Sequence, residues 1–200
     1  MIAVVDYGGG NLGSLTSALA RRRADFVVTS DPLEVARADA AILPGDGAFG
    51  ATMDALRERG LDDAVLSIIA AGKPFLGICV GMQVLYERSD EFGEHAGLGA
   101  FEGIVSRFAS APRVPHMGWN QLEVLRDHPF VRGLGPDSYA YFLHSYRAAI
   151  DADTLAACEH GDRFAAIAAR DNVMATQFHP EKSQATGARL LDNFIGLCAC

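Results

Sequence analysis

Short apolar runs alternate with amphipathic segments through the first ninety residues of this chain. The apolar runs are rich in Val, Ile and Leu and have the length of buried strands, and the segments between them have the apolar spacing of helices. Crossovers of this length keep neighbouring strands parallel, so the pattern predicts an α/β fold with a mostly parallel sheet and helices on both faces. The predicted elements are strands at 2–6, 26–30, 39–45 and 73–79 and helices at 10–23, 51–60 and 61–72.

The second half of the chain has a different pattern. Its predicted strands alternate apolar and polar residues as exposed or hairpin strands do, and they lie at 101–108, 120–125, 139–150 and 164–169. Only the last segment returns to a strand followed by a helix, at 173–199. No stretch has the composition of a linker or a repeat, so we expect a single domain over residues 1–200.

The net charge and the hydropathy of the chain argue against nucleic acids and membranes as partners. Seventeen Lys and Arg against twenty-five Asp and Glu give a net charge of −8, which argues against a nucleic-acid surface. The longest apolar runs are well short of the roughly 18 to 20 residues of a membrane helix. The chain opens on MIAVVDYGGG, without a basic segment or a cleavage site, and we therefore expect a cytoplasmic protein that binds neither membranes nor nucleic acid.

The four cysteines form no CxxC pair and no regular framework. A chain this long does not need disulfides, so we expect no disulfide framework, no metal site and no cofactor. Cys198 and Cys200 stand at the extreme C-terminus, where a frayed tail is expected.

Cys79 stands between Gly77 and Gly81 in KPFLGICVGMQ, after a predicted strand and before a predicted helix. This is the layout of a nucleophile elbow, in which a strained turn holds the reactive side chain above the sheet. A thiol at a helix N-terminus is activated by the helix dipole, and the Val80 N–H would lie beside an oxyanion. The alternative is a small buried cysteine in a tight turn, and the elbow alone favours neither.

A cysteine nucleophile needs a general base, normally a histidine that a third group orients. Of the six histidines, His179 follows a predicted strand in QFHPEKS, so it would lie on the same rim as Cys79. Pro180 makes the loop rigid, and Glu181 can then orient the ring. A helix start with an acidic first turn is the alternative, but the combination with the elbow favours a triad.

A glycine-rich loop, LPGDGAFG at 43–50, follows the third predicted strand. Its spacing matches neither GxGxxG nor a P-loop, so nucleotide binding is poorly supported. Beside an acyl-transfer nucleophile, such a loop could rotate a backbone N–H toward the oxyanion.

Together GICVGMQ, PGDGAFG and QFHPEKS resemble the class I (triad) glutamine amidotransferases. DYGGGNLGS, PHMGWN and YFLHSY are more specifically similar to the glutaminase subunits of imidazole glycerol phosphate synthase. The resemblance implies a flavodoxin-like sheet carrying an antiparallel insertion, and a glutamyl thioester formed by the triad Cys79, His179 and Glu181. It further implies an oxyanion hole from Gly45, Asp46, Gly47 and Val80, and contacts to L-glutamine from Gln83, His144, Ser145 and Tyr146. Asp46 departs from the family pattern, which has an apolar residue there, and a carboxylate near an oxyanion opposes catalysis.

The resemblance also implies a partner, the (β/α)8 cyclase subunit that makes imidazole glycerol phosphate and AICAR in histidine biosynthesis, bound as a heterodimer with an ammonia channel. Aromatic residues and Met are typical of interface centres, although ordinary sheet packing is the alternative for each. The interface candidates are Asn11, Met117, Trp119, Tyr141 and Lys182.

Two other functions stay open. The triad could serve another synthase, such as pyridoxal phosphate synthase, or belong to a stand-alone cysteine hydrolase. The string PHMGWN at 115–120 favours imidazole glycerol phosphate synthase over both. The domain could also be a catalytically silent regulatory module, which the presence of all three triad residue types argues against.

Overall fold

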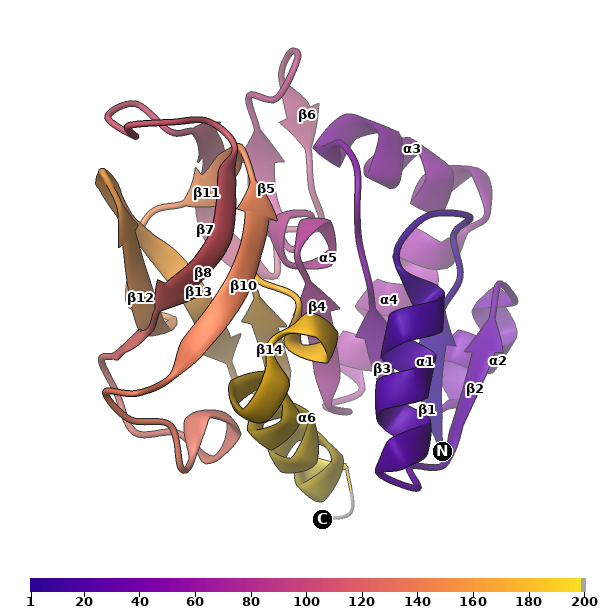
Figure 1. The fold of residues 1–200 in the computed structure, drawn as a ribbon. Helices are drawn as coiled ribbons and strands as arrows, with labels where there is room; N and C mark the ends of the chain where they lie inside the picture. The colour runs from indigo at the N-terminus through magenta and orange to yellow at the C-terminus, as the bar shows by residue number, and fades with distance from the viewer. Residues whose placement is uncertain (199–200) are drawn as a thin grey trace.

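The computed structural model of this protein describes residues 1–198, so Cys200 of the expected frayed tail lies outside the described residues. Within that range, the central sheet has eight strands in the order β2-β1-β3-β4-β14-β13-β12-β9 (Figure 1). The first five of these are parallel, and they are β2 (Phe26–Thr29), β1 (Ile2–Val5), β3 (Ala40–Leu43), β4 (Phe75–Ile78) and β14 (Val173–Thr176). This order is that of flavodoxin-like sheets, as the resemblance implied.

Helices cover both faces of the sheet, as predicted. One face carries α1 (Leu12–Arg21) and α6 (Gln184–Leu197), and the other carries α2 (Pro32–Arg37), α3 (Phe49–Glu58) and α4 (Leu61–Ala70) (Figure 1). Of these five helices, α2 alone was not predicted from the sequence, although its start signals are present. Asp31 accepts the Leu33 N–H at 2.9 Å, and Pro32 is the first helical residue. Among residues 1–198 no helix combines the length and hydropathy that a membrane span needs.

The chain between β4 and β14 forms the predicted antiparallel insertion. A four-stranded sheet has the order β11-β7-β5-β6, in which only β5 and β7 run parallel, and β8 pairs with β10 in a separate antiparallel ribbon. The bounds are β5 (Tyr86–Ser89), β6 (His95–Ala96), β7 (Phe101–Arg107), β8 (His116–Gln121), β10 (Tyr139–His144) and β11 (Tyr146–Ala148). The main sheet gains β9 (Glu123–Val124), β12 (Thr154–His160) and β13 (Asp162–Arg170).

Three expectations for this half were wrong in detail. The single strand expected at 139–150 is two strands, because β10 ends at His144 and β11 starts at Tyr146 and pairs with β7 in the other sheet. The run 164–169 belongs to β13 and is buried throughout, because β12 and β14 flank it in the main sheet and it is not an exposed hairpin strand. The single strand expected at 120–125 is split, since β8 ends at Gln121 and β9 starts at Glu123.

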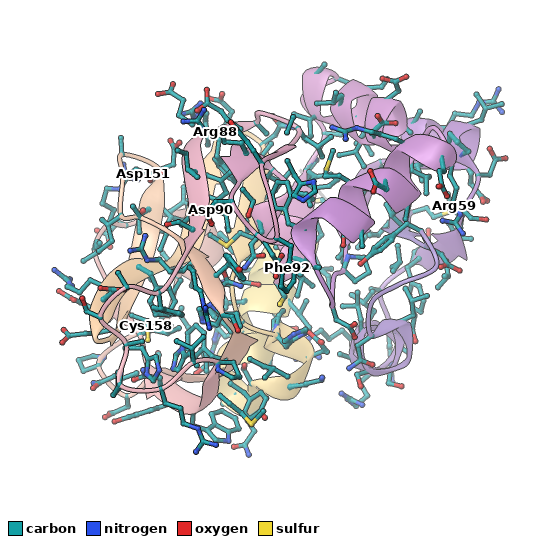
Figure 2. The ribbon with its side chains drawn as sticks, turned by 90° about the horizontal axis from the view of Figure 1, so that it is seen from above. Arg59, Arg88, Asp90, Phe92, Asp151 and Cys158 are labelled. Carbon is teal, nitrogen blue, oxygen red and sulfur yellow. The ribbon has the colours of Figure 1, made fainter. Side chains whose placement is uncertain are left out.

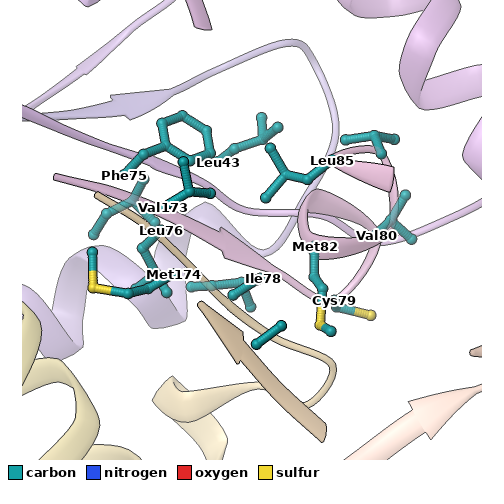
Figure 3. Close-up of a cluster of buried hydrophobic side chains, with 14 of the residues drawn as sticks. Leu43, Phe75, Leu76, Ile78, Cys79, Val80, Met82, Leu85, Val173 and Met174 are labelled. Atoms are coloured by element: carbon teal, nitrogen blue, oxygen red, sulfur yellow. The ribbon is translucent and has the colours of Figure 1, made fainter. Parts of the chain in front are cut away.

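The hydrophobic core reaches the end of β4, where the elbow begins. Leu76, Ile78 and Met174 pack there beside Cys79 and Met82 (Figure 3). The turn therefore rests on close-packed side chains, which restrict how far its backbone can move.

Candidate active site

Cys79 sits on a strained turn directly after β4. Its backbone has φ 56° and ψ −112°, a left-handed conformation that non-glycine residues rarely adopt, and its N–H donates to the Thr176 carbonyl at 2.8 Å. Such strain costs on the order of 1–3 kcal/mol and persists only where the surroundings enforce it. The following helix, α5 (Val80–Gln83), has only four residues, so the expected contribution of a helix dipole to thiol activation is small.

Glycines let three backbone segments meet at this turn. A Cβ on Gly81 would lie 2.0 Å from the carbonyl oxygen of Leu43, and one on Gly77 would lie 2.5 Å from the Gly81 carbonyl oxygen. A Cβ on Gly45, in the neighbouring loop, would lie 2.4 Å from the Gly81 nitrogen. The two glycines around Cys79 therefore serve close packing of backbone on backbone, which no side chain would permit.

His179 and Glu181 lie together after β14. The ring Nδ1 of His179 and Oε1 of Glu181 are 2.9 Å apart, and their side chains are only 6% and 2% exposed. Both residues flank Pro180, which opens the short helix η2 (Pro180–Lys182). Because Glu181 occupies Nδ1, the ring leaves Nε2 for a partner on its other side.

Cys79 lines the same cavity as this ring and influences its charge. Burial of the His179 ring favours its neutral form, but hydrogen bonds to the Cys79 side chain and to Glu181 favour the charged form more strongly and raise the pKa of His179 to about 10. The His179 ring is therefore an imidazolium at neutral pH and holds a proton that it could donate. A nucleophile, a general base and an orienting carboxylate would need this order of side chains.

The backbone of His179 is tied to β10. Its N–H donates to the Tyr141 carbonyl at 3.4 Å, and its carbonyl accepts from the Ser183 hydroxyl at 2.7 Å. The same hydroxyl accepts the Tyr141 N–H at 3.0 Å, which closes a ring of hydrogen bonds. The position of the histidine therefore depends on the strand that carries Tyr141.

A cavity of about 450 Å³ opens over Cys79 and His179. The structure brings most of the residues singled out from the sequence to its walls, namely Asp46, Gly47, Cys79, Val80, Gln83, His144, Ser145, Tyr146, His179 and Lys182. Gly45 is buried behind the wall, and Glu181 stands behind His179. The exposed residues Asp46 and Gly47 form the loop beside Cys79, and Gly47 has φ 108°.

Sequence reasoning missed Glu91, Pro115 and Leu143, which also line this cavity. Glu91 is only 9% exposed and accepts the Phe49 N–H at 2.6 Å, which gives α3 the cap that its own Ala48 lacks. In the sequence it stands in DEFGE, which reads as a solvated loop. The next residue, Phe92, is 87% exposed and stands near the middle of the molecule seen from above (Figure 2).

The interface candidates are spread over β8, β10, η2 and the N-cap of α1. Met117 and Trp119 on β8 are 63% and 48% exposed, and the Trp119 ring lies 6.0 Å from that of half-buried Tyr141 on β10. Half-buried Asn11 caps α1 by accepting the Ser14 N–H at 3.4 Å, and Lys182 is exposed at the edge of the cavity. The ribbon of β8 and β10 thus presents an apolar, aromatic outer face.

Comparisons with known proteins agree with this site. The family described as "Glutamine amidotransferase class-I" matches residues 3–197. The imidazole glycerol phosphate synthase subunit HisH of Sulfurimonas denitrificans is 46% identical over 97% of this chain and 97% of its own. The subunit of the same name from Salinibacter ruber is 48% identical over 98% of this chain and 94% of its own.

A solved structure described as a glutamine amidotransferase aligns with 100% of this chain and 99% of its own, with a TM-score of 0.78. At 24% identity that likeness shows the fold alone. The family match and the relatives of similar length show the family as well as the fold. This chain belongs to the class-I glutamine amidotransferases and, within that family, groups with the HisH subunits of imidazole glycerol phosphate synthase.

Proposed function

We propose that this chain is the glutaminase subunit of imidazole glycerol phosphate synthase, releasing ammonia from L-glutamine for histidine biosynthesis. One observation carries the proposal: the His179 ring, whose Nδ1 lies 2.9 Å from Glu181 Oε1, shares with Cys79 the wall of a cavity of about 450 Å³. Identities of 46% and 48% to HisH subunits over nearly the whole chain support this choice of synthase. The family match to residues 3–197 and the single hydrophobic cluster support one amidotransferase domain.

In the proposed reaction the Cys79 thiolate attacks the carboxamide carbon of glutamine. The tetrahedral intermediate places its oxyanion toward the Val80 N–H and the Gly45–Asp46–Gly47 backbone, as acyl transfer requires. His179 then gives its proton to the departing nitrogen, so that ammonia leaves and a glutamyl thioester remains. His179 next takes a proton from water, the hydroxide attacks the thioester carbon, and the carbon–sulfur bond breaks, which releases glutamate and restores the Cys79 thiolate beside the protonated ring.

The cavity walls suit the rest of the substrate. We assign the amino-acid part of glutamine to Gln83 and to the backbone at His144, Ser145 and Tyr146. The buried Glu91 carboxylate would attract the α-ammonium group, because an acid in a partly desolvated wall prefers a cation as neighbour.

Ammonia at neutral pH is mostly ammonium, which is a poor nucleophile, so release into a dry passage favours transfer. We propose that the receiver is the (β/α)8 cyclase subunit, in a heterodimer. The exposed apolar face of β8 and β10, with Met117 and Trp119, supports an interface there, and Asn11, Tyr141 and Lys182 would extend it. We propose a cytoplasmic location, since the relatives are named as subunits of a biosynthetic synthase.

The decisive experiment measures glutamate release by the purified chain alone, with the cyclase subunit, and with the cyclase and its nucleotide ligand. We expect slow hydrolysis by the chain alone and at least a tenfold increase in the complex, because the loop at Asp46 and Gly47 is exposed and the bound cyclase could fix its conformation. Equal and rapid hydrolysis without the cyclase would contradict this dependence. Hydrolysis that only a different synthase stimulates would overturn the assignment to imidazole glycerol phosphate synthase.

Asp46 offers a test of the oxyanion loop. We expect Asp46→Asn to raise the glutaminase kcat of the complex by about two- to tenfold, because repulsion between a carboxylate and an oxyanion a few Å away costs roughly 1 kcal/mol in a solvated site. Steady-state assays at saturating glutamine measure this. The matched control is Asp54→Asn, which makes the same charge change on the exposed side of α3, outside the cavity lining. An unchanged or lower kcat for Asp46→Asn would show that this carboxylate does not oppose the reaction.

A further inference from the structure

A cluster of three histidines that the triad does not use begins with His144 in the cavity wall and continues behind it. His116 on β8 stacks on His160 of β12, with ring centroids 4.2 Å apart and planes at 19°, and its centroid lies 5.1 Å from that of His144 on β10. His116 and His144 are 4% and 7% exposed. The surrounding rings are those of Phe108, Phe142 and Phe164.

The hydrogen bonds among these groups have only one consistent direction when the rings are neutral. The Tyr146 carbonyl can only accept, so the 2.8 Å contact with His144 Nδ1 requires an N–H there. His144 Nε2 must then accept from His116 Nδ1 at 3.1 Å. His116 Nε2 in turn accepts from the Asn120 amide at 3.2 Å, and that amide also donates to the Glu159 carbonyl at 2.8 Å. The chain runs from Asn120 through both rings to Tyr146.

Charge supports this assignment. Burial, with a smaller effect of His160, lowers the pKa of His116 to about 4. Burial also lowers the pKa of His144 to about 3, and the neighbouring His116, His160 and His179 disfavour its charged form further. Both rings are therefore neutral near pH 7, and each hydrogen-bond partner fixes the tautomer of the next ring.

The Tyr146 carbonyl is held from the elbow side as well. It accepts the Gln83 amide at 3.0 Å, and the same amide nitrogen donates to Gln177 Oε1 at 3.0 Å. The Gln177 amide nitrogen lies 4.0 Å from Cys79 Sγ. The peptide that follows Tyr146 is thus fixed between the histidine pair and the residues around the nucleophile.

We propose that His116 is a positioning residue for glutamine binding: through His144 it fixes the Tyr146 carbonyl, and so holds the Ser145–Tyr146 backbone against which the substrate lies. This inference rests on the proposed glutaminase function. His116 touches no reacting atom, so its replacement should change the KM for glutamine far more than kcat. Trp119 directly precedes Asn120, so the chain of hydrogen bonds starts beside the exposed aromatic face of β8.

Two substitutions separate positioning from packing. An asparagine amide reaches the place of a histidine Nδ1 and a glutamine amide reaches that of Nε2, so His116→Asn keeps the donor toward His144, whereas His116→Gln keeps only the contact with Asn120. Both variants lose the stacked ring. In the cyclase complex we expect His116→Asn to keep the glutamine KM within about threefold of the wild type. We expect His116→Gln to raise it at least tenfold, with kcat within about threefold.

The matched control is His160→Phe, which keeps a stacked ring outside the chain of hydrogen bonds and should leave KM unchanged. Denaturant unfolding of each variant establishes that it is folded. Equal KM values for His116→Asn and His116→Gln would show that the cluster acts only by packing. An equal increase of KM in His160→Phe would show the same, and either result would overturn the proposal. Absence of glutaminase activity in the wild-type complex would instead overturn the proposed function.

A second readout does not depend on activity. Nitrogen-15 NMR of the histidine rings distinguishes the two neutral tautomers from imidazolium. At pH 7 we expect His116 and His144 to be neutral with the proton on Nδ1. An imidazolium or an Nε2–H tautomer at either ring would contradict the directed chain, and the proposal with it.

Discussion

Cys79→Ala is expected to abolish glutamine-dependent synthesis by the complex while synthesis from added ammonium salt continues. Without the sulfur no thioester forms, and only binding and oxyanion stabilisation remain, so glutaminase kcat should fall by at least about 10⁴-fold. The cyclase does its own chemistry and needs only ammonia, so its rate with ammonium chloride should stay within about twofold. Product formation with each nitrogen source, measured on the same preparation, gives both values.

Cys158→Ala is the matched control for this loss. Cys158 lies in β12, is 3% exposed, and burial raises the pKa of its thiol to about 12, so it stays protonated and unreactive. This variant should keep both activities. Retention of glutamine-dependent synthesis in Cys79→Ala would remove Cys79 from the mechanism. Loss of both activities would point to failed assembly with the cyclase.

The parallel half of the fold was predictable because its strands, apart from the edge strand β2, are buried on both faces. The runs that contain β1 and β3 are almost wholly apolar, and helices of matching period separate them, so local pattern and final environment agree. In the second half of the chain, the local sequence pattern and the final environment of the strands do not agree. The alanine-rich β13 carries little information on which face is covered, and its burial follows from pairing with β12 and β14, which are distant choices that no local pattern specifies.

The site residues also divide into those that local sequence predicts and those that only tertiary pairing brings together. Cys79 could be found because an elbow needs glycines on both sides, and His179 and Glu181 because their spacing around Pro180 is short and local. Glu91 could not be found, since its burial depends on α3 lying beside the β5–β6 hairpin. The histidine pair has no local signature either, because β8 and β10 meet only through tertiary pairing, which sets His144 opposite His116.

Gly81→Ala is expected to destabilise the protein by about 3 kcal/mol or more, a large share of the roughly 5–15 kcal/mol that folding provides. The added Cβ would meet the Leu43 carbonyl oxygen at 2.0 Å, and that atom belongs to a central strand that cannot yield as a side-chain tip can. Gly45 and Gly77 already approach the Gly81 backbone too closely to accept a Cβ of their own, so the turn has no direction in which to relax.

Urea unfolding of the variant beside Gly13→Ala tests this. Gly13 lies on the exposed side of α1 with no atom within 4 Å of a built Cβ, so alanine there should stabilise by about 0.5–1 kcal/mol through helix propensity. The two changes are chemically identical and should have opposite signs. Because Cys79 is two residues from Gly81, any shift that relieves the clash also moves the sulfur relative to His179, so the molecules that still fold should lose glutaminase activity. Wild-type stability and activity in Gly81→Ala would show that β3 and the elbow are not in backbone contact, and that something else holds Cys79 in its strained conformation.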